Sequence, residues 1–98
     1  MQIIDDNTVV VNNSEEFKKA LSEENDYNYI YLGNDITLTS GFTINANKTN
    51  LIIDGTYNNV KYTYTNNLNE SSDVIKASTS NRKITLKNMN IISSHTYG

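Results

Sequence analysis

Short runs of apolar, β-branched and aromatic residues recur along this chain and alternate with polar turns rich in Asn. The three strongest runs are Tyr29–Gly33, Leu51–Gly55 and Lys83–Asn88. Such runs are typical of β-strands, and no helical pattern separates them. Repeated β units of roughly 20 to 35 residues are typical of a β-solenoid, in which each unit buries its apolar face against the next. Weaker runs of the same kind lie at Asp35–Leu38, Phe42–Ile44, Val60–Tyr64 and Asp73–Ala77.

A single helix is expected near the N-terminus. Thr8–Asn12 contains three consecutive valines and predicts a short strand. Asn13 or Ser14 follows as the N-cap; with Asn13 as the cap, Glu16 stands three positions later and completes a capping-box pattern. An apolar stripe then predicts a helix of about ten residues, and the helical pattern fades near Asn25. The stripe consists of Phe17, Ala20 and Leu21.

The chain has 98 residues, which suits a single domain. We divide it into a flexible tail at residues 1–7, a cap strand and helix at residues 8–26, and coils of short strands at residues 27–98. The spacing of apolar residues supports coils of nearly constant length. Two series recur, at intervals of 24 and 22 residues respectively: Ile36, Val60 and Ile84, and Ile30, Ile52 and Val74.

Composition and charge exclude several classes of protein. No cysteine is present, so disulfides do not stabilise the fold. The net charge is -3, the pI is about 4.9 and the basic residues are scattered, which argues against nucleic acid as a partner. No apolar run reaches the roughly 18 residues that span a bilayer. Met1–Asp6 has neither the basic nor the apolar segment of a signal peptide, so the chain either stays inside the cell or has lost an export signal.

The strand, the capped helix and four later segments follow one another in a distinctive order. The later segments are Ile30–Leu38, Phe42–Thr49, Leu51–Gly55 and Ile84–Ile91. This order resembles the N-terminal cap and first coils of pectate-lyase-like right-handed parallel β-helices. It is most similar to the pectate-lyase-like adhesive domains of Gram-positive bacterial surface proteins, over residues 8–98. The resemblance implies an all-β fold: a segment of right-handed parallel β-helix with one N-terminal capping α-helix.

Lyases of this fold hold calcium with acidic residues on one face and use Arg or Lys as the base. Asp35, Asp54 and Asp73 recur at intervals of 19 residues and are the calcium candidates here. Asp35 and Asp54 lie beside Gly turns, where Asp commonly bonds its own backbone, so we favour turn roles and expect no cofactor. Arg82 is the sole Arg and lies in a polar turn, which favours a solvated surface charge. His95 is the sole His, which excludes a zinc site with several His ligands.

Tyrosine is frequent, and four tyrosines are candidates for carbohydrate binding. Exposed Tyr rings on a flat β surface can stack on sugars and hydrogen-bond through their hydroxyls. In the alternative interpretation, which we favour, the rings only cover the sheet. Strand alternation places Tyr29 and Tyr31 on one face of their strand and Ile30 on the other. The four candidates are Tyr29, Tyr31, Tyr62 and Tyr64.

The resemblance implies a non-catalytic adhesive or structural module at a bacterial cell surface, outside the cell. Carbohydrate or a surface protein would be its partner. Two alternatives remain open: the N-terminal part of a polysaccharide lyase or glycosidase, and a phage tail-spike module. Because the family continues with further coils, the last coil of this chain is expected to be exposed. An open stack of strands favours association, so we predict self-association through that end.

Overall fold

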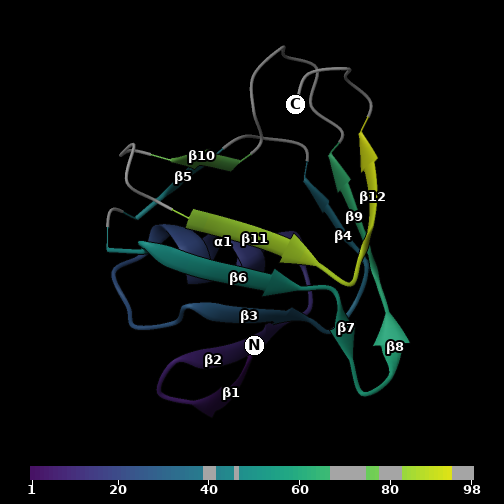
Figure 1. The fold of residues 1–98 in the computed structure, drawn as a ribbon, viewed down its shortest axis with the longest axis horizontal. Helices are drawn as coiled ribbons and strands as arrows, with labels where there is room; N and C mark the ends of the chain where they lie inside the picture. The colour runs from purple at the N-terminus through teal and green to yellow at the C-terminus, as the bar shows by residue number, and fades with distance from the viewer. Residues whose placement is uncertain (39–41, 46, 67–74, 78–82, 94–98) are drawn as a thin grey trace.

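The computed structural model of this protein describes residues 1–38, 42–45, 47–66, 75–77 and 83–93. These residues are mostly β-strand, with one helix (Figure 1). The all-β prediction with one N-terminal helix is therefore confirmed. In chain order the elements are β1 (Gln2–Asp5), β2 (Thr8–Val11), α1 (Ser14–Ser22), β3 (Tyr29–Leu32), β4 (Ile36–Leu38), β5 (Phe42–Ile44), β6 (Asn50–Asp54), β7 (Thr56–Tyr57), β8 (Val60–Lys61), β9 (Thr63–Asn66), β10 (Ile75–Ala77), β11 (Lys83–Lys87) and β12 (Asn90–Ser93).

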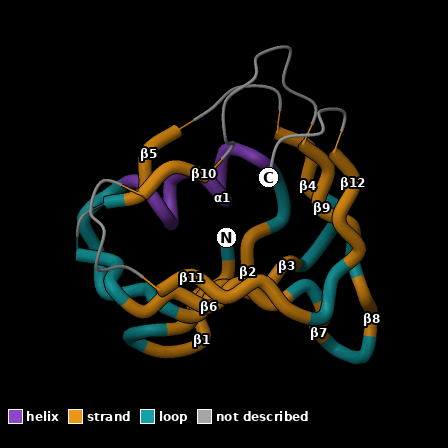
Figure 2. The backbone as a smooth tube through the Cα atoms, turned by 45° about the horizontal axis from the view of Figure 1, so that its top comes forward, coloured by secondary structure: helices purple, strands orange, loops and turns teal. Residues whose placement is uncertain are grey.

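Three sets of parallel strands surround a shared interior (Figure 2). The first sheet has the order β1-β2-β3-β6-β11, the second β12-β9-β4 and the third β10-β5. The chain visits these sheets in turn, through β3, β4 and β5, then β6, β9 and β10, and then β11 and β12. The sheets are mixed, because β1 pairs with β2 in the antiparallel sense and β7 pairs with β8 as an antiparallel hairpin.

Inward-facing side chains of neighbouring strands stack in register and form the core. In the first sheet Val9 lies beside Ile30, Ile30 beside Ile53, and Ile53 beside Leu86. Val9, Ile30 and Ile53 are at most 1 % exposed, whereas Leu86 is 39 % exposed. Burial of each ladder residue therefore depends on the next coil, and it declines at β11.

Helix α1 packs against β2, β4 and β5 and begins at the predicted cap. The side chain of Asn13 accepts a hydrogen bond from the backbone N–H of Glu16 at 2.9 Å. Glu16 in turn accepts from the backbone N–H of Asn12 at 3.0 Å, so the cap is reciprocal but shifted by one residue from the expected pattern. The predicted apolar stripe, namely Phe17, Ala20 and Leu21, is buried.

Residues 2–5, expected to belong to a flexible tail, form strand β1. Gln2 lies opposite Val10, and Ile3 lies opposite Val9. The amino group of Met1 is 2.9 Å from the Glu16 carboxylate, which joins the strand to α1. Every residue of β1 is exposed, so the sequence carries no pattern of buried positions from which this strand could be predicted. The strand forms because of a non-local contact: it pairs with the backbone N–H and C=O groups at the edge of β2, which would otherwise be unpaired.

The predicted constant spacing of coils is wrong. Ile30 lies beside Ile53, 23 residues later, whereas Ile36 lies beside Tyr64, 28 residues later. Val60 belongs to β8 rather than to a ladder, and Val74 lies outside the described residues. The reason is a hairpin inserted between β6 and β9, which lengthens that corner of the coil.

The inserted hairpin also divides the run Val60–Tyr64, which was expected to be one strand. β8 ends at Lys61, and β9 begins at Thr63. The hairpin turns through Asn58 and Asn59, whose φ values are 52° and 65°. Two consecutive residues with positive φ are typical of the type I′ turn, which matches the twist of paired strands, and Asn tolerates this conformation.

Candidate functional site

A group of tyrosine rings lies on the outer face of the first sheet. Tyr29 and Tyr31 point away from the core, while Ile30 and Leu32 between and after them are buried. The ring centroids of Tyr29 and Tyr31 are 4.9 Å apart. Tyr57, from the hairpin strand β7, lies 5.3 Å from Tyr31. We call these three residues the tyrosine cluster.

Asp54 anchors the cluster to the sheet. The hydroxyl of Tyr29 donates to Oδ2 of Asp54 at 2.7 Å. Oδ1 of Asp54 accepts from the backbone N–H of Thr56 at 3.0 Å and from the side-chain amide of Asn88 at 3.4 Å. Burial and the neighbouring Asp54 carboxylate raise the pKa of the Tyr29 hydroxyl. Asp54 is only 6 % exposed and both of its oxygens are engaged, so its role here is to position the turn and the Tyr29 ring.

The ammonium group of Lys87 lies over one ring of the cluster. Nζ of Lys87 lies 5.4 Å from the centroid of the Tyr29 ring, a distance at which cation and ring attract. Lys87 is placed there by strand register, because it lies beside Asp54 in the neighbouring strand, and Asp54 lies beside Tyr31. The three neighbouring strands β3, β6 and β11 thus each contribute one residue to a single outward column.

A cleft of about 650 Å³ opens beside the cluster. Its lining includes the rings of two tyrosines and the side-chain amides of three asparagines. Asn88, like the two turn residues of the hairpin, has a positive φ, here 56°, which sets its side chain at the corner between β11 and β12. Rings beside amide groups suit a ligand with flat apolar faces and many hydroxyls. The lining residues are Ile4, Asp5, Thr8, Tyr31, Asp54, Thr56, Tyr57, Asn58, Asn59 and Asn88.

Comparison with known proteins identifies the family. The model of the pectate lyase-like adhesive domain matches residues 8–98. The chain belongs to this family. No curated protein and no solved structure matches it. In the described part of the chain, no helix is long and apolar enough to cross a membrane.

Two of the three calcium candidates of this pectate lyase-like adhesive domain, Asp35 and Asp54, lie among the described residues, and each accepts a hydrogen bond from a backbone N–H group. Asp35 accepts a hydrogen bond from the backbone N–H of Thr63 at 2.8 Å and so connects the turn before β4 to β9. Asp54 lies in the first sheet, and Asp73 is outside the described residues, as are Arg82 and His95. Within the described ranges, no group of three or more His, Asp or Glu side chains could hold a metal ion. Asp54 accepts from the backbone N–H of Thr56 two residues later, within its own turn, whereas Asp35 accepts from the distant strand β9.

The four candidate tyrosines fall into two pairs. Tyr29 and Tyr31 lie together on the outer face, as alternation predicted. Tyr64 is 5 % exposed and its ring lies 5.7 Å from Phe17, so it is a core residue rather than part of an outer surface. Tyr62 packs against the same core.

Several residues of the tyrosine cluster and of the cleft beside it were not among the candidates. They include Tyr57, Asn58, Asn59, Lys87 and Asn88. For Tyr57 a signal existed in the sequence: the pair Asn58-Asn59 is typical of a tight hairpin turn, which would have placed the preceding Tyr on a projecting strand. Lys87 and Asn88 reach the site only through strand register. Single-sequence reasoning had no access to that register.

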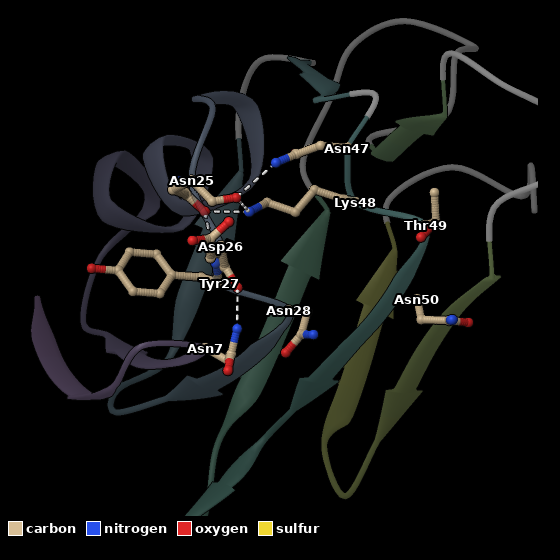
Figure 3. A pocket seen from close by; sticks show the side chains of 9 residues that line it. All are labelled: Asn7, Asn25, Asp26, Tyr27, Asn28, Asn47, Lys48, Thr49 and Asn50. Atoms are coloured by element: carbon tan, nitrogen blue, oxygen red, sulfur yellow. Dashed lines mark hydrogen bonds between the residues drawn. The ribbon is translucent and has the colours of Figure 1, made fainter.

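A second pocket, of about 260 Å³, lies at the corner where the loop after α1 meets the start of β6 (Figure 3). Many of its polar groups are already bonded within the chain. The side-chain amide of Asn7 donates to the Asp26 carbonyl at 3.1 Å, and that of Asn47 donates to the Asn25 carbonyl at 2.8 Å. Lys48 enters the pocket wall from the side of β6 and is almost fully buried. This corner joins the cap to the first full coil.

Proposed function

We propose that this domain is a non-catalytic adhesive module of a bacterial cell-surface protein, which binds carbohydrate through the tyrosine cluster. We further propose that it forms the N-terminal part of a right-handed parallel β-helix. The family match supports an adhesive role, and the three parallel sheets visited in turn support the β-helix. The engagement of both Asp54 oxygens supports a binding rather than a catalytic role for the outer face.

One observation carries the proposal: Tyr31 contacts the rings of both Tyr29 and Tyr57, and Tyr31 and Tyr57 line a cleft together with asparagine amides. Rings held by neighbours lose little conformational entropy when a ligand stacks on them. The amides of Asn58, Asn59 and Asn88 supply both donors and acceptors, which is what a sugar with several hydroxyls requires. Lys87 adds attraction for a ligand that also carries negative charge.

Replacing Tyr57 with Ala is expected to weaken carbohydrate binding about tenfold, since loss of one stacking ring costs about 1.4 kcal/mol. The measurement is a glycan-array screen followed by titration of the best ligand, in buffer containing a chelator of divalent cations. The matched control is Val60→Ala, because Val60 is exposed and lies opposite Tyr57 in the same hairpin. Equal affinities for the two variants, or binding that needs a divalent metal, would contradict the proposal.

We also propose that the β11–β12 end of the stack associates with a second copy. β10, β11 and β12 each stand last in their sheets, and the inward residues Leu86 and Ile91 are 39 % and 56 % exposed. At the opposite end α1 packs against β4 and β5, the edge strands of the other two sheets, so an end-to-end pair is favoured over a head-to-tail filament. Lys83 and Lys87 border β11 and bring like charges together, so the pair should strengthen as salt screens them.

Light scattering of the wild-type chain is expected to show a mass that rises from monomer to dimer with concentration, more steeply at high salt. Ile91→Lys should remain monomeric, because it places a charge in the contact. Ile3→Lys is the control, since Ile3 is 62 % exposed at the opposite end. A strict monomer at high concentration and high salt would refute self-association.

A further inference from the structure

Lys48 is buried in the second pocket without a carboxylate partner. Its side chain is 2 % exposed. Nζ donates to the backbone carbonyl oxygen of Asn25 at 3.0 Å and also to the side-chain oxygen, Oδ1, of the same residue. Among the described residues, no Asp or Glu forms an ion pair with Lys48. An ammonium group held only by neutral oxygens in a buried position is expensive, and loss of its proton removes most of that cost.

The side-chain amide of Asn25 is held on every side. Oδ1 accepts from the backbone N–H of Tyr27 at 3.0 Å in addition to Lys48. Nδ2 donates to the carbonyl oxygens of Ala20 at 3.2 Å and Glu23 at 3.1 Å. The amide group is therefore fixed beside the amine. A backbone N–H aimed at the carbonyl oxygen is also what stabilises negative charge on that oxygen during attack at the carbon.

The surroundings shift the amine toward its uncharged, nucleophilic form. Burial lowers the pKa of the Lys48 amine, and the nearby Asp26 carboxylate opposes this effect only in part. Asp26 lines the same pocket, and Figure 3 shows it beside Asn25 and Lys48. A carboxylate at that place can accept a proton from Nζ and pass it to the amide nitrogen that departs.

We propose that Lys48 and Asn25 become joined by an intramolecular amide bond. Nζ of the neutral amine attacks Cγ of Asn25, and a Nζ–Cγ bond forms. The Cγ–Nδ2 bond breaks, one proton moves from Nζ to Nδ2 through Asp26, and Nδ2 leaves as ammonia. The atoms balance without an oxidant, a reductant or a further reactant. The product amide is neutral, so the buried charge of Lys48 is removed.

The bond would fasten the cap to the body of the domain. Asn25 lies in the loop after α1, and Lys48 lies in the corner before β6, so β3, β4 and β5 are enclosed between the joined residues. The enclosed segment contains Tyr29 and Tyr31. A covalent link at this place would let the first coil resist unfolding when the domain is pulled through a bound ligand.

Mass spectrometry of the folded wild-type chain tests the proposal. The intact mass is expected to be lower than the sequence mass by one ammonia. Digestion should release a branched peptide in which the Asn25 and Lys48 segments are joined. An intact mass equal to the sequence mass, or separate unmodified peptides for the two segments, would overturn it.

Two other reactions also release ammonia: cyclisation of Gln2 after removal of Met1, and succinimide formation at an Asn. The variant Lys48→Arg distinguishes these two reactions from the proposed bond. Arg keeps the positive charge, and its guanidinium stays protonated and cannot act as a nucleophile. Loss of ammonia should disappear in this variant, and its persistence would overturn the proposal. Protein kept in urea from synthesis onward should remain unlinked, since only the fold brings the two groups together. Branched peptide from the denatured chain would likewise count against it.

Discussion

Gly55→Ala is expected to destabilise the domain by about 3 kcal/mol, because the added methyl group meets backbone that cannot move. A Cβ at this position would lie 2.1 Å from Cβ and 2.7 Å from Cα of Met89. The backbone of Gly55 is held on both sides: its N–H donates to the Lys87 carbonyl at 2.9 Å, and its carbonyl accepts from Tyr62 at 2.8 Å. Urea denaturation followed by circular dichroism measures the free energy of unfolding.

Gly33→Ala is the comparison for Gly55→Ala. A Cβ on Gly33 would lie 2.5 Å from Oδ1 of Asn12 and 2.7 Å from Cγ1 of Val10, both of which are side-chain atoms. The Asn12 side chain is exposed and can turn away, so a smaller loss of stability is expected at this position. Gly55 lies in the corner between β6 and β7, and Met89 lies in the corner between β11 and β12. Equal free energies of unfolding for the two variants would mean that the close approach of these corners does not require Gly55.

Ile53→Ala is expected to reduce the free energy of unfolding by about 3 kcal/mol, within the range of buried Ile to Ala changes. Ile53 lies in the middle of the inward ladder and is 1 % exposed, so its removal leaves a cavity between two coils. Leu86→Ala removes a side chain from the same ladder at its open end, where solvent fills the space. That variant is expected to lose less than about 1 kcal/mol in dilute solution.

The two ladder variants are compared in the same denaturation experiment, at a concentration low enough to keep the chain monomeric. Similar losses at both positions would mean that Leu86 is covered and that the stack does not open at β11. A small loss for Ile53→Ala would mean that this part of the interior tolerates voids.

The helix and most strands were predictable because their signals are local. Asn13 and Glu16 mark the start of α1 within four residues, and the apolar stripe follows within the next five. Register was not predictable, because it depends on the length of each corner. Nothing in the spacing of Val60 revealed that it belongs to an inserted hairpin rather than to a ladder.

The part of the candidate site that lies on one continuous strand could be predicted from the alternation of inward and outward side chains. The part that depends on contacts between strands could not. Tyr29 and Tyr31 lie in one continuous strand, so their common face followed from the sequence. Tyr62 and Tyr64 are two positions apart and both pack against core residues, so alternation at these positions indicates a buried face rather than a binding surface. Lys87 contacts the Tyr29 ring although the two residues are 58 positions apart in the sequence, and only the pairing of the strands brings them together.

The β7–β8 hairpin leaves the stack between β6 and β9 without disturbing either neighbour. β6 stays in parallel register with β3 and β11, and β9 stays in register with β4 and β12. The length and sequence of this hairpin can therefore change during evolution without a change in the core residues. A lineage of such domains could acquire new ligands by exchanging a few corner residues, with little risk to folding. The hairpin that carries Tyr57 is then the part of the domain where sequences should diverge first.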